Sequence, residues 1–173
     1  GRPREGKVGQ LQDIRDEVNR LAKDMRSLSH ALRPSVLDQL GLVAAVQTLL
    51  ANIAEATGIK TDMKVLGVEH RLDRELELAL FRIAQEALNN VRQHSEARSV
   101  KVQIHFGADS MKVVVSDDGK GFNFPKQLSY LASTGKLGMI GMEERAKILG
   151  GNLSICSKPN AGTSITVETP YMK

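Results

Sequence analysis

A carboxylate, a carboxamide and an imidazole recur at four-residue intervals near the middle of this sequence, at Glu86, Asn90 and His94. On an α-helix, residues four apart project from one face, about one turn above each other. Such a row can position a water or hydroxyl group, contact a phosphate and supply an oxygen to Mg²⁺, which takes few protein oxygens when phosphates and waters complete its shell. Taken alone, an E-x-x-x-N pattern is more often a solvated helix face.

A second cluster follows a run of valines, where Asp117 is succeeded by Gly119 and Gly121. This order places a carboxylate at the tip of a strand, and the glycines let the backbone turn sharply and approach a ligand closely. Because a carboxylate only accepts hydrogen bonds, Asp117 suits an exocyclic amino group such as that of adenine. An isolated Asp-Asp-Gly sequence is mostly just a turn.

In a third cluster, glycines recur at every third residue, at Gly135, Gly138 and Gly141, where a helix is expected to begin. Exposed amides at a helix N-terminus, with the helix dipole behind them, can bind an anion, and Lys136 adds a positive charge. The segment is neither a Walker loop nor a Rossmann fingerprint, because it lacks the required spacing and no strand runs directly into it. A flexible hinge is the alternative. The final strand, which Thr163 opens, is uninformative by itself.

Hydrophobic periodicity indicates the elements that position these clusters. Apolar residues at heptad-like spacing predict a helix over 11–32, which ends before Pro34 and needs a partner helix to cover its apolar seam. Asp73 is the expected N-cap of a long helix, and Gly58 the expected C-terminal cap of the helix before it. Further helices are predicted at 42–56, 74–94 and 137–149, and strands at 59–66, 99–106, 111–116, 152–157 and 163–169.

We therefore expect an α/β fold, a two-layer sandwich of a mixed β-sheet with the helices over 74–94 and 137–149 on one face. A coiled-coil-like helix would precede it. The connection over 117–136 is longer than a structural link requires, which favours a binding loop or lid.

The composition is that of an ordinary globular protein, with 41% hydrophobic and 25% charged residues. The single cysteine, Cys156, cannot form an intramolecular disulfide, which favours a cytoplasmic location. The sequence contains no run of about 18 apolar residues, so we expect no direct membrane contact by this chain. Nucleic-acid binding is not expected, because the net charge of +4 is spread along the chain and aromatic residues make up only 3%.

The order of these clusters resembles that of the ATP-binding catalytic domain of sensor histidine kinases, in the GHKL ATPase superfamily that also includes gyrase and Hsp90. The resemblance runs over residues 76–170. Within it, Phe81–Asn90 is similar to the family's N box, Asp117–Phe122 to its G1 box, and Gly138–Ala146 to the G2 region of the NarL-type subgroup. Upstream, Leu32–Leu42 is similar to the segment that joins the dimerization helices of that subgroup to its catalytic domain.

The resemblance implies the GHKL (Bergerat) fold and a site for ATP and Mg²⁺. Asn90 would coordinate the Mg²⁺ bound to the ATP phosphates, and Glu86 would assist phosphoryl transfer as a base or an electrostatic orienter. Asp117 would accept a hydrogen bond from the adenine amino group. The other ATP-binding positions that it implies are His94, Gly119, Gly121, Phe122, Lys136, Leu137, Gly138, Met139, Gly141 and Thr163.

Two features depart from a complete enzyme of that family. Gln93 stands where the family commonly has Lys or Arg, three residues after the metal-binding Asn, so His94 or Lys136 would have to supply the phosphate contact. No histidine fits as phosphoacceptor: His30 is the best motif match, but no acidic residue follows it, and the Leu-Arg-Pro after it fits the end of the second dimerization helix. We expect the chain to bind Mg-ATP without becoming phosphorylated.

The implied function is the catalytic portion of a two-component sensor histidine kinase. Residues 1–40 would be the C-terminal part of the dimerization and phosphotransfer domain (its second helix), and 41–173 the ATP-binding catalytic domain. The γ-phosphoryl of ATP would pass to a histidine outside this fragment and then to a response regulator, of NarL/LuxR-like type. The intact protein would be a homodimer, cytoplasmic or the cytoplasmic part of a membrane sensor.

Two alternatives stay open at this point. One is a different enzyme of the superfamily, either an ATPase of gyrase or Hsp90 type in which Glu86 activates water, or a serine kinase. The other is a nucleotide-dependent interaction module in which the N-terminal coiled coil contacts the partner.

Overall fold

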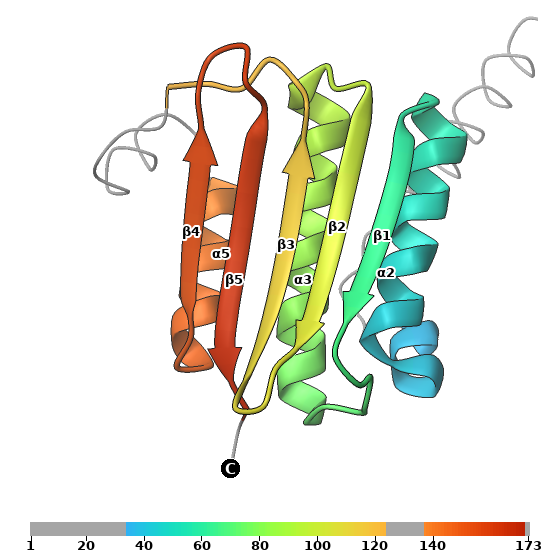
Figure 1. Ribbon diagram of the computed structural model, residues 1–173, viewed down its shortest axis with the longest axis vertical. Helices are drawn as coiled ribbons and strands as arrows, with labels where there is room; N and C mark the ends of the chain where they lie inside the picture. Colours follow the sequence, from blue (N-terminus) through green and yellow to red (C-terminus); the bar gives the residue numbers. More distant parts are fainter. Residues whose placement is uncertain (1–33, 124–136, 172–173) are drawn as a thin grey trace, which may run out of the picture.

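The computed structural model describes residues 34–123 and 137–171, which form a five-stranded sheet with helices on one face (Figure 1). The helices are α2 (Ser35–Thr57), α3 (Arg74–Asn90) and α5 (Leu137–Ile148), and a π-helical turn, η1 (Val91–Ser95), continues α3. The strands are β1 (Lys60–Leu66), β2 (Ser99–Phe106), β3 (Ser110–Asp117), β4 (Asn152–Ser157) and β5 (Thr163–Pro170). The helix predicted over 11–32 and most of the predicted lid lie outside the described residues.

The sheet is mixed, as predicted, with the strand order β1-β2-β3-β5-β4. β1 runs parallel to β2, and every other pair is antiparallel. The parallel pair requires a crossover, which α3 provides, so α3 lies behind the middle of the sheet (Figure 1). The inward side chains predicted for β2 are all buried: Val100, Val102, Ile104 and Phe106.

The helix α3 begins where the sequence predicts. Asp73 Oδ1 accepts a hydrogen bond from the Glu75 N–H at 2.8 Å, which satisfies one of the free amides of the first turn. The apolar face predicted for this helix is buried against the sheet and the other helices: Leu76, Leu80, Ile83, Ala84, Ala87, Leu88 and Val91. The α/β sandwich is therefore confirmed.

The last turn of this helix corrects the prediction of a straight α-helix to His94. The α-helix ends at Asn90, and the wider π turn η1 follows. The Ser95 hydroxyl donates to the Val91 carbonyl at 2.7 Å, and the Ser95 carbonyl accepts from the Lys120 N–H at 2.7 Å. This contact with a distant turn favours the π geometry, which local periodicity does not reveal. The straight row of Glu86 and Asn90 does not continue to His94.

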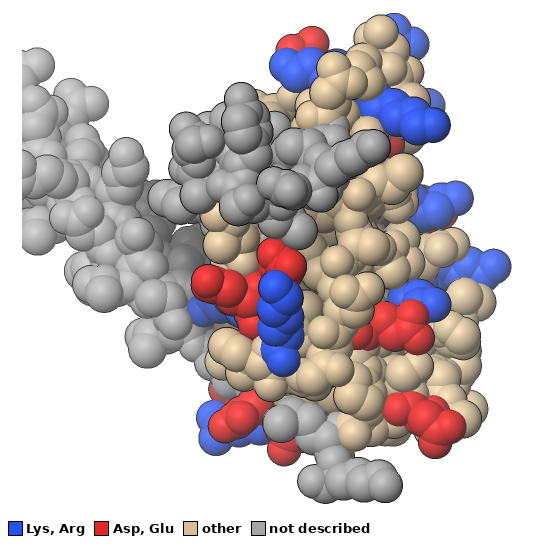
Figure 2. Space-filling view, turned by 90° about the vertical axis from the view of Figure 1, so that its left-hand side faces the viewer, with Lys and Arg blue, Asp and Glu red and all other residues tan. Residues whose placement is uncertain are grey.

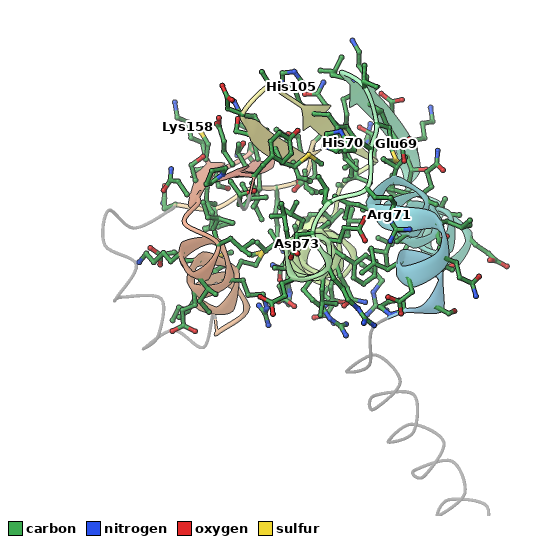
Figure 3. All side chains as sticks on the ribbon, turned by 90° about the horizontal axis from the view of Figure 1, so that it is seen from below. Glu69, His70, Arg71, Asp73, His105 and Lys158 are labelled. Atoms are coloured by element: carbon green, nitrogen blue, oxygen red, sulfur yellow. The ribbon has the colours of Figure 1, made fainter. Side chains whose placement is uncertain are left out.

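The helix α2 starts earlier than the predicted Leu42, at Ser35, and is kinked at Gly41, whose φ is +83°. The kink leaves carbonyls at the end of the first segment without helical partners. Arg71 donates to two of them, Leu37 O at 3.3 Å and Asp38 O at 3.2 Å, and also pairs with buried Glu77 at 2.9 Å. Figure 3 shows Arg71 reaching from the β1–α3 connection toward α2. The division of the chain at residue 40 stays a prediction.

By length and a mean hydropathy of 1.5, α2 could cross a membrane. Its apolar residues, including Leu42, Val46 and Leu50, are however buried in the core, where α2 packs on α3 and β1. Figure 3, seen from below, shows α2, α3 and α5 side by side on the same face of the sheet. We therefore assign α2 as a core helix of this domain.

Candidate functional site

A cavity of about 510 Å³ opens between α3, η1, the first turn of α5 and the adjoining ends of β3 and β5. It brings together residues that are far apart in the sequence. The sequence-predicted residues that line it are Glu86, Asn90, His94, Asp117, Gly121, Phe122, Gly138, Met139 and Thr163. Residues from all three predicted clusters and from the start of the last strand thus share one volume.

Two of the remaining predicted positions, Gly119 and Gly141, do not line this cavity. Gly119 lies beneath the turn, where a Cβ would overlap the Ser95 carbonyl oxygen. A Cβ on Gly141 would lie 3.0 Å from Nη1 of Arg145, so this glycine leaves room for a guanidinium group. Leu137 opens α5, and Lys136 lies outside the described residues.

Asn90 presents a polar group that the protein does not satisfy. Its Nδ2 is buried and has no hydrogen-bond partner, one of two such side-chain atoms in the described part of the chain. A buried amide without a partner is costly, and the carboxamide can turn either its oxygen or its nitrogen toward a ligand. The described residues contain no group of three or more His, Cys, Asp or Glu that could enclose a metal. A cation here would therefore take an amide oxygen from the protein and complete its shell with phosphates and water.

Asp117 and Asp118 are neighbours with different roles. Asp117 lines the cavity, and its Oδ1 accepts from the Gly119 N–H at 2.8 Å. Burial raises the pKa of Asp117, against the lowering effect of the backbone hydrogen bonds from Gly119 and Thr163. Asp118 is exposed, and its Oδ1 accepts from the N–H groups of Arg98 and Ser99, each at 2.8 Å. The second carboxylate anchors the start of β2, and the first is left for a ligand.

Glu86 lies at the other end of the cavity, against the start of α5. A Cβ on Gly138 would overlap Glu86 Oε1, so only a glycine lets the helix approach this carboxylate without displacing it. The contact places the first turn of α5 beside Glu86, about one α3 turn from Asn90. Carboxylate, carboxamide and helix N-terminus therefore converge on one end of the cavity.

Ser157 is a site-supporting residue that sequence reasoning missed. Its hydroxyl accepts from the Phe122 N–H at 2.9 Å, donates to the Gly162 carbonyl at 3.1 Å and lies 2.9 Å from the Thr163 hydroxyl. It therefore ties the glycine-rich turn after β3 to the β4–β5 hairpin. A Cβ on Gly162, whose φ is +70°, would overlap the Asp117 carbonyl oxygen. No local pattern marks these positions, because their roles depend on distant segments.

The positive charges around the cavity are only partly available. Lys120 lines it, but its Nζ pairs with Glu96 at 2.7 Å. Gln93 donates to Asn89 Oδ1 at 3.2 Å, so it is held along the helix. His94 is exposed and lines the cavity. Its contact with a phosphate stays a prediction.

On the side of the molecule formed by β4 and α5, basic and acidic side chains are interspersed, and the described surface shows no extended patch of one sign (Figure 2). An example of such pairing on α5 is Lys147 with Glu143, at 2.7 Å. This side therefore gives no support for a nucleic-acid interface.

Comparison with known proteins agrees with the geometry. Residues 75–173 match the family model described as histidine kinase-, DNA gyrase B-, and HSP90-like ATPase. The chain is 37% identical over 161 residues to the signal transduction histidine-protein kinase/phosphatase DegS of Brevibacillus brevis, covering 93% of this chain and 40% of that protein. It is 37% identical over 153 residues to the oxygen sensor histidine kinase NreB of Staphylococcus carnosus, covering 88% of this chain and 43% of that protein. The chain thus spans less than half the length of these relatives.

Solved structures show the same fold. The histidine kinase domain of the Erythrobacter litoralis EL346 blue-light activated histidine kinase superposes with a TM-score of 0.56 at 22% identity, over 73% of this chain and 59% of that one. The Acinetobacter baumannii histidine kinase AdeS gives a TM-score of 0.60 at 15% identity, over 100% of this chain and 88% of that one.

Proposed function

Because its match over residues 75–173 shows that the chain belongs to the histidine kinase-, DNA gyrase B- and HSP90-like ATPase family, we propose that it is the ATP-binding catalytic portion of a two-component sensor histidine kinase. The observation that carries the proposal is one cavity that Asp117 and the unsatisfied amide of Asn90 both line. The similarity to named sensor histidine kinases supports the kinase over the other activities of the family.

In the proposed site, different residues contact the adenine and the phosphates of ATP. Asp117 accepts a hydrogen bond from the adenine amino group, while Gly121, Phe122 and Thr163 shape the purine end of the cavity. Asn90 supplies an oxygen to Mg²⁺, which neutralises charge on the phosphates when bound. These residues position the nucleotide, and positioning with charge neutralisation is the main source of catalysis in phosphoryl transfer.

Glu86 is placed to act on the acceptor. It lies beside Gly138, one turn along α3 from Asn90, at the end of the cavity away from Asp117. There its carboxylate orients the acceptor imidazole or accepts its proton, while the N-terminal amides of α5 stabilise charge on the terminal phosphate. His94 takes the phosphate contact that Gln93 does not provide.

In the intact protein, the phosphoryl group passes to a histidine outside this chain and then to an aspartate of a response regulator, of NarL/LuxR-like type. We place the protein as a homodimer in the cytoplasm, or as the cytoplasmic part of a membrane sensor. These steps rest on the family and on the named relatives, of which this chain covers only part.

Calorimetric titration with Mg-ATP tests the proposal. The chain should bind Mg-ATP, and Asn90→Ala should weaken Mg-ATP far more than it weakens ADP in EDTA, because the metal contact is absent from the second titration. The bound nucleotide should be chemically unchanged until the histidine-bearing domain of the intact protein is added, when label from γ-³²P-ATP should appear on that domain. Release of inorganic phosphate without label transfer would instead identify an ATPase, and absence of binding would refute the proposal.

A further inference from the structure

Three residues at the purine end of the cavity lie in one row across the sheet. Thr163 opens β5 and is paired on one side with Asp117, the last residue of β3, and on the other side with Ser157, the last residue of β4. Figure 1 shows these three strand ends side by side at the upper edge of the sheet. Asp117 and Thr163 line the cavity, whereas Ser157 is not among the residues that line it. The hydrogen bonds along this row determine which groups a bound base meets.

The single proton of the Ser157 hydroxyl is committed to Gly162. Ser157 Oγ accepts from the Phe122 N–H at 2.9 Å, donates to the Gly162 carbonyl at 3.1 Å and lies 2.9 Å from Thr163 Oγ1. A hydroxyl has one proton and two lone pairs, so it cannot donate to both Gly162 and Thr163. Gly162 is buried, and a buried carbonyl that loses its donor is costly. The proton of Ser157 therefore serves Gly162.

The contact between the two hydroxyl groups then has only one direction. Thr163 must donate its own hydroxyl proton to Ser157, whose second lone pair accepts it. The backbone N–H of Thr163 donates to the Asp117 carboxylate. Both protons of Thr163 are thus used within the protein, and only the lone pairs of its Oγ1 remain for a ligand.

The backbone amides of the glycine-rich turn beside this row are also occupied. The Gly119 N–H donates to Asp117 Oδ1 at 2.8 Å, and the Lys120 N–H donates to the Ser95 carbonyl at 2.7 Å. The Phe122 N–H donates to Ser157. Asp117 and Thr163 therefore present hydrogen-bond acceptors to a base, next to amides whose protons are already used.

The adenine amino group has two protons, and Asp117 accepts one of them in the proposed site. We propose that Thr163 Oγ1 accepts the second, and that Ser157 is the positioning residue that keeps Thr163 an acceptor by holding the Thr163 proton toward β4. This inference rests on the proposed function and deepens it. Ser157, which does not touch the nucleotide, contributes to the choice of a 6-amino purine over a 6-oxo purine.

Calorimetric titration of the whole chain with Mg-ATP and with Mg-ITP tests the inference, because the base of ITP carries a carbonyl oxygen in place of the amino group. Wild type should bind Mg-ATP more tightly. Ser157→Ala removes the acceptor of the Thr163 proton, so the Thr163 hydroxyl becomes free to turn and donate to the carbonyl oxygen of ITP. The ratio of ATP affinity to ITP affinity should fall by about two- to tenfold, the size of one neutral hydrogen bond.

A purely structural role of Ser157 predicts a different result. Loss of the hydrogen bonds to Gly162 and Phe122 would weaken the binding of both nucleotides together and leave the affinity ratio unchanged. Ser154→Ala, at an exposed serine of the same strand outside the cavity lining, is the matched control and should leave the ratio at the wild-type value. In a Thr163→Val background, which has no hydroxyl to orient, Ser157→Ala should not change the ratio further.

Thr163→Val alone keeps the inference falsifiable if Ser157→Ala does not fold. If Thr163 Oγ1 accepts a proton from adenine, valine should weaken Mg-ATP more than Mg-ITP, and the ratio should fall. If the Thr163 hydroxyl instead donates to the base, the same variant should weaken Mg-ITP more, and the ratio should rise. A rise would overturn the inference.

The other outcomes separate the role of Ser157 from the proposed function. An unchanged ratio in Ser157→Ala, or a wild type that binds Mg-ATP and Mg-ITP equally, would overturn the role of Ser157 and leave the proposed function standing, because ATP would still bind. A fall in the ratio that is equal in Ser154→Ala, or that persists in the Thr163→Val background, would overturn it as well. A wild-type chain that binds neither nucleotide would remove the proposed function and the role of Ser157 together.

Discussion

Replacing Asp117 with asparagine should separate stability from purine recognition. The Asp117 Oδ1 accepts from the Gly119 N–H at 2.8 Å, and an asparagine oxygen can accept the same bond, so the turn should survive. What the variant lacks is the negative charge that the proposed site offers to the adenine amino group. The asparagine amide N–H₂ would also face the adenine amino group, and two donors cannot hydrogen-bond to each other.

The structure sets the size of the effect on binding. One charge-assisted hydrogen bond is lost, and such bonds contribute about 1.5–3 kcal/mol. The affinity for Mg-ATP should therefore fall by about 10–100-fold. Guanine presents an acceptor oxygen at the corresponding position, which the asparagine amide can satisfy, so the ratio of ATP affinity to GTP affinity should fall further. Calorimetric titration with both nucleotides measures these changes.

In the absence of nucleotide, Asp117→Asn should not lower the free energy of unfolding, although it weakens nucleotide binding. Because burial raises the pKa of Asp117, the ionised carboxylate is disfavoured in the folded state, and the stability that protonation provides is lost as pH rises through the folded pKa. Asparagine is neutral and avoids this loss. Urea denaturation without nucleotide should show Asp117→Asn at least as stable as wild type at pH 7, with the advantage disappearing as pH falls toward 3.8, the ordinary pKa of an aspartate. A variant that binds ATP as wild type does, or that is markedly less stable at pH 7, would refute the reasoning.

Three further predictions concern residues outside the purine end. Arg71→Ala should lower the free energy of unfolding by about 3 kcal/mol, because Glu77 is only 1% exposed and loses its guanidinium partner. Urea denaturation of the double variant Arg71→Met with Glu77→Leu is the control. A smaller loss of stability in the double variant would confirm the cause, and an equal loss would contradict it. Asp118→Ala should cost about 1 kcal/mol after allowance for its exposure. Hydrogen bonds from Ser99 lower the pKa of Asp118, so this stability is present above 3.8 and is lost as pH falls through the folded pKa, and acid titration of the variant should lack that transition. Gly138→Ala should displace the Glu86 carboxylate, because the added Cβ would overlap it. Nucleotide affinity should change little, but transfer of label from γ-³²P-ATP to the histidine-bearing domain should be lost. Label transfer at the wild-type level would show that the displacement of Glu86 does not matter.

Much of the fold follows from local pattern. Alternating apolar residues place β2 at Ser99–Phe106, as predicted, and Asp73 marks the first residue before α3. The clusters at Glu86–Asn90 and Asp117–Gly121 could be proposed as one site because their order along the chain resembles a family. Periodicity alone did not bring them together.

The features that the sequence did not predict depend on contacts between distant segments. The kink at Gly41 is braced by Arg71, thirty residues later, and the π turn ending at Ser95 is fixed by Lys120. The anchoring role of Asp118 was not predicted, since only the positions of Arg98 and Ser99 show that this carboxylate is already occupied. Each is a long-range hydrogen bond, which hydrophobic periodicity does not encode.

Backbone amide NMR of the chain titrated with Mg-ATP tests the central claim most directly, because it locates the ligand as well as detecting it. We predict saturable shifts at Asn90, at Asp117–Phe122, at Gly138 and at Thr163, with the open face of the sheet, such as Gln103, unaffected. Absence of saturable shifts, or shifts that leave Asn90 and Asp117 unchanged, would contradict a single cavity that binds both the metal and the purine.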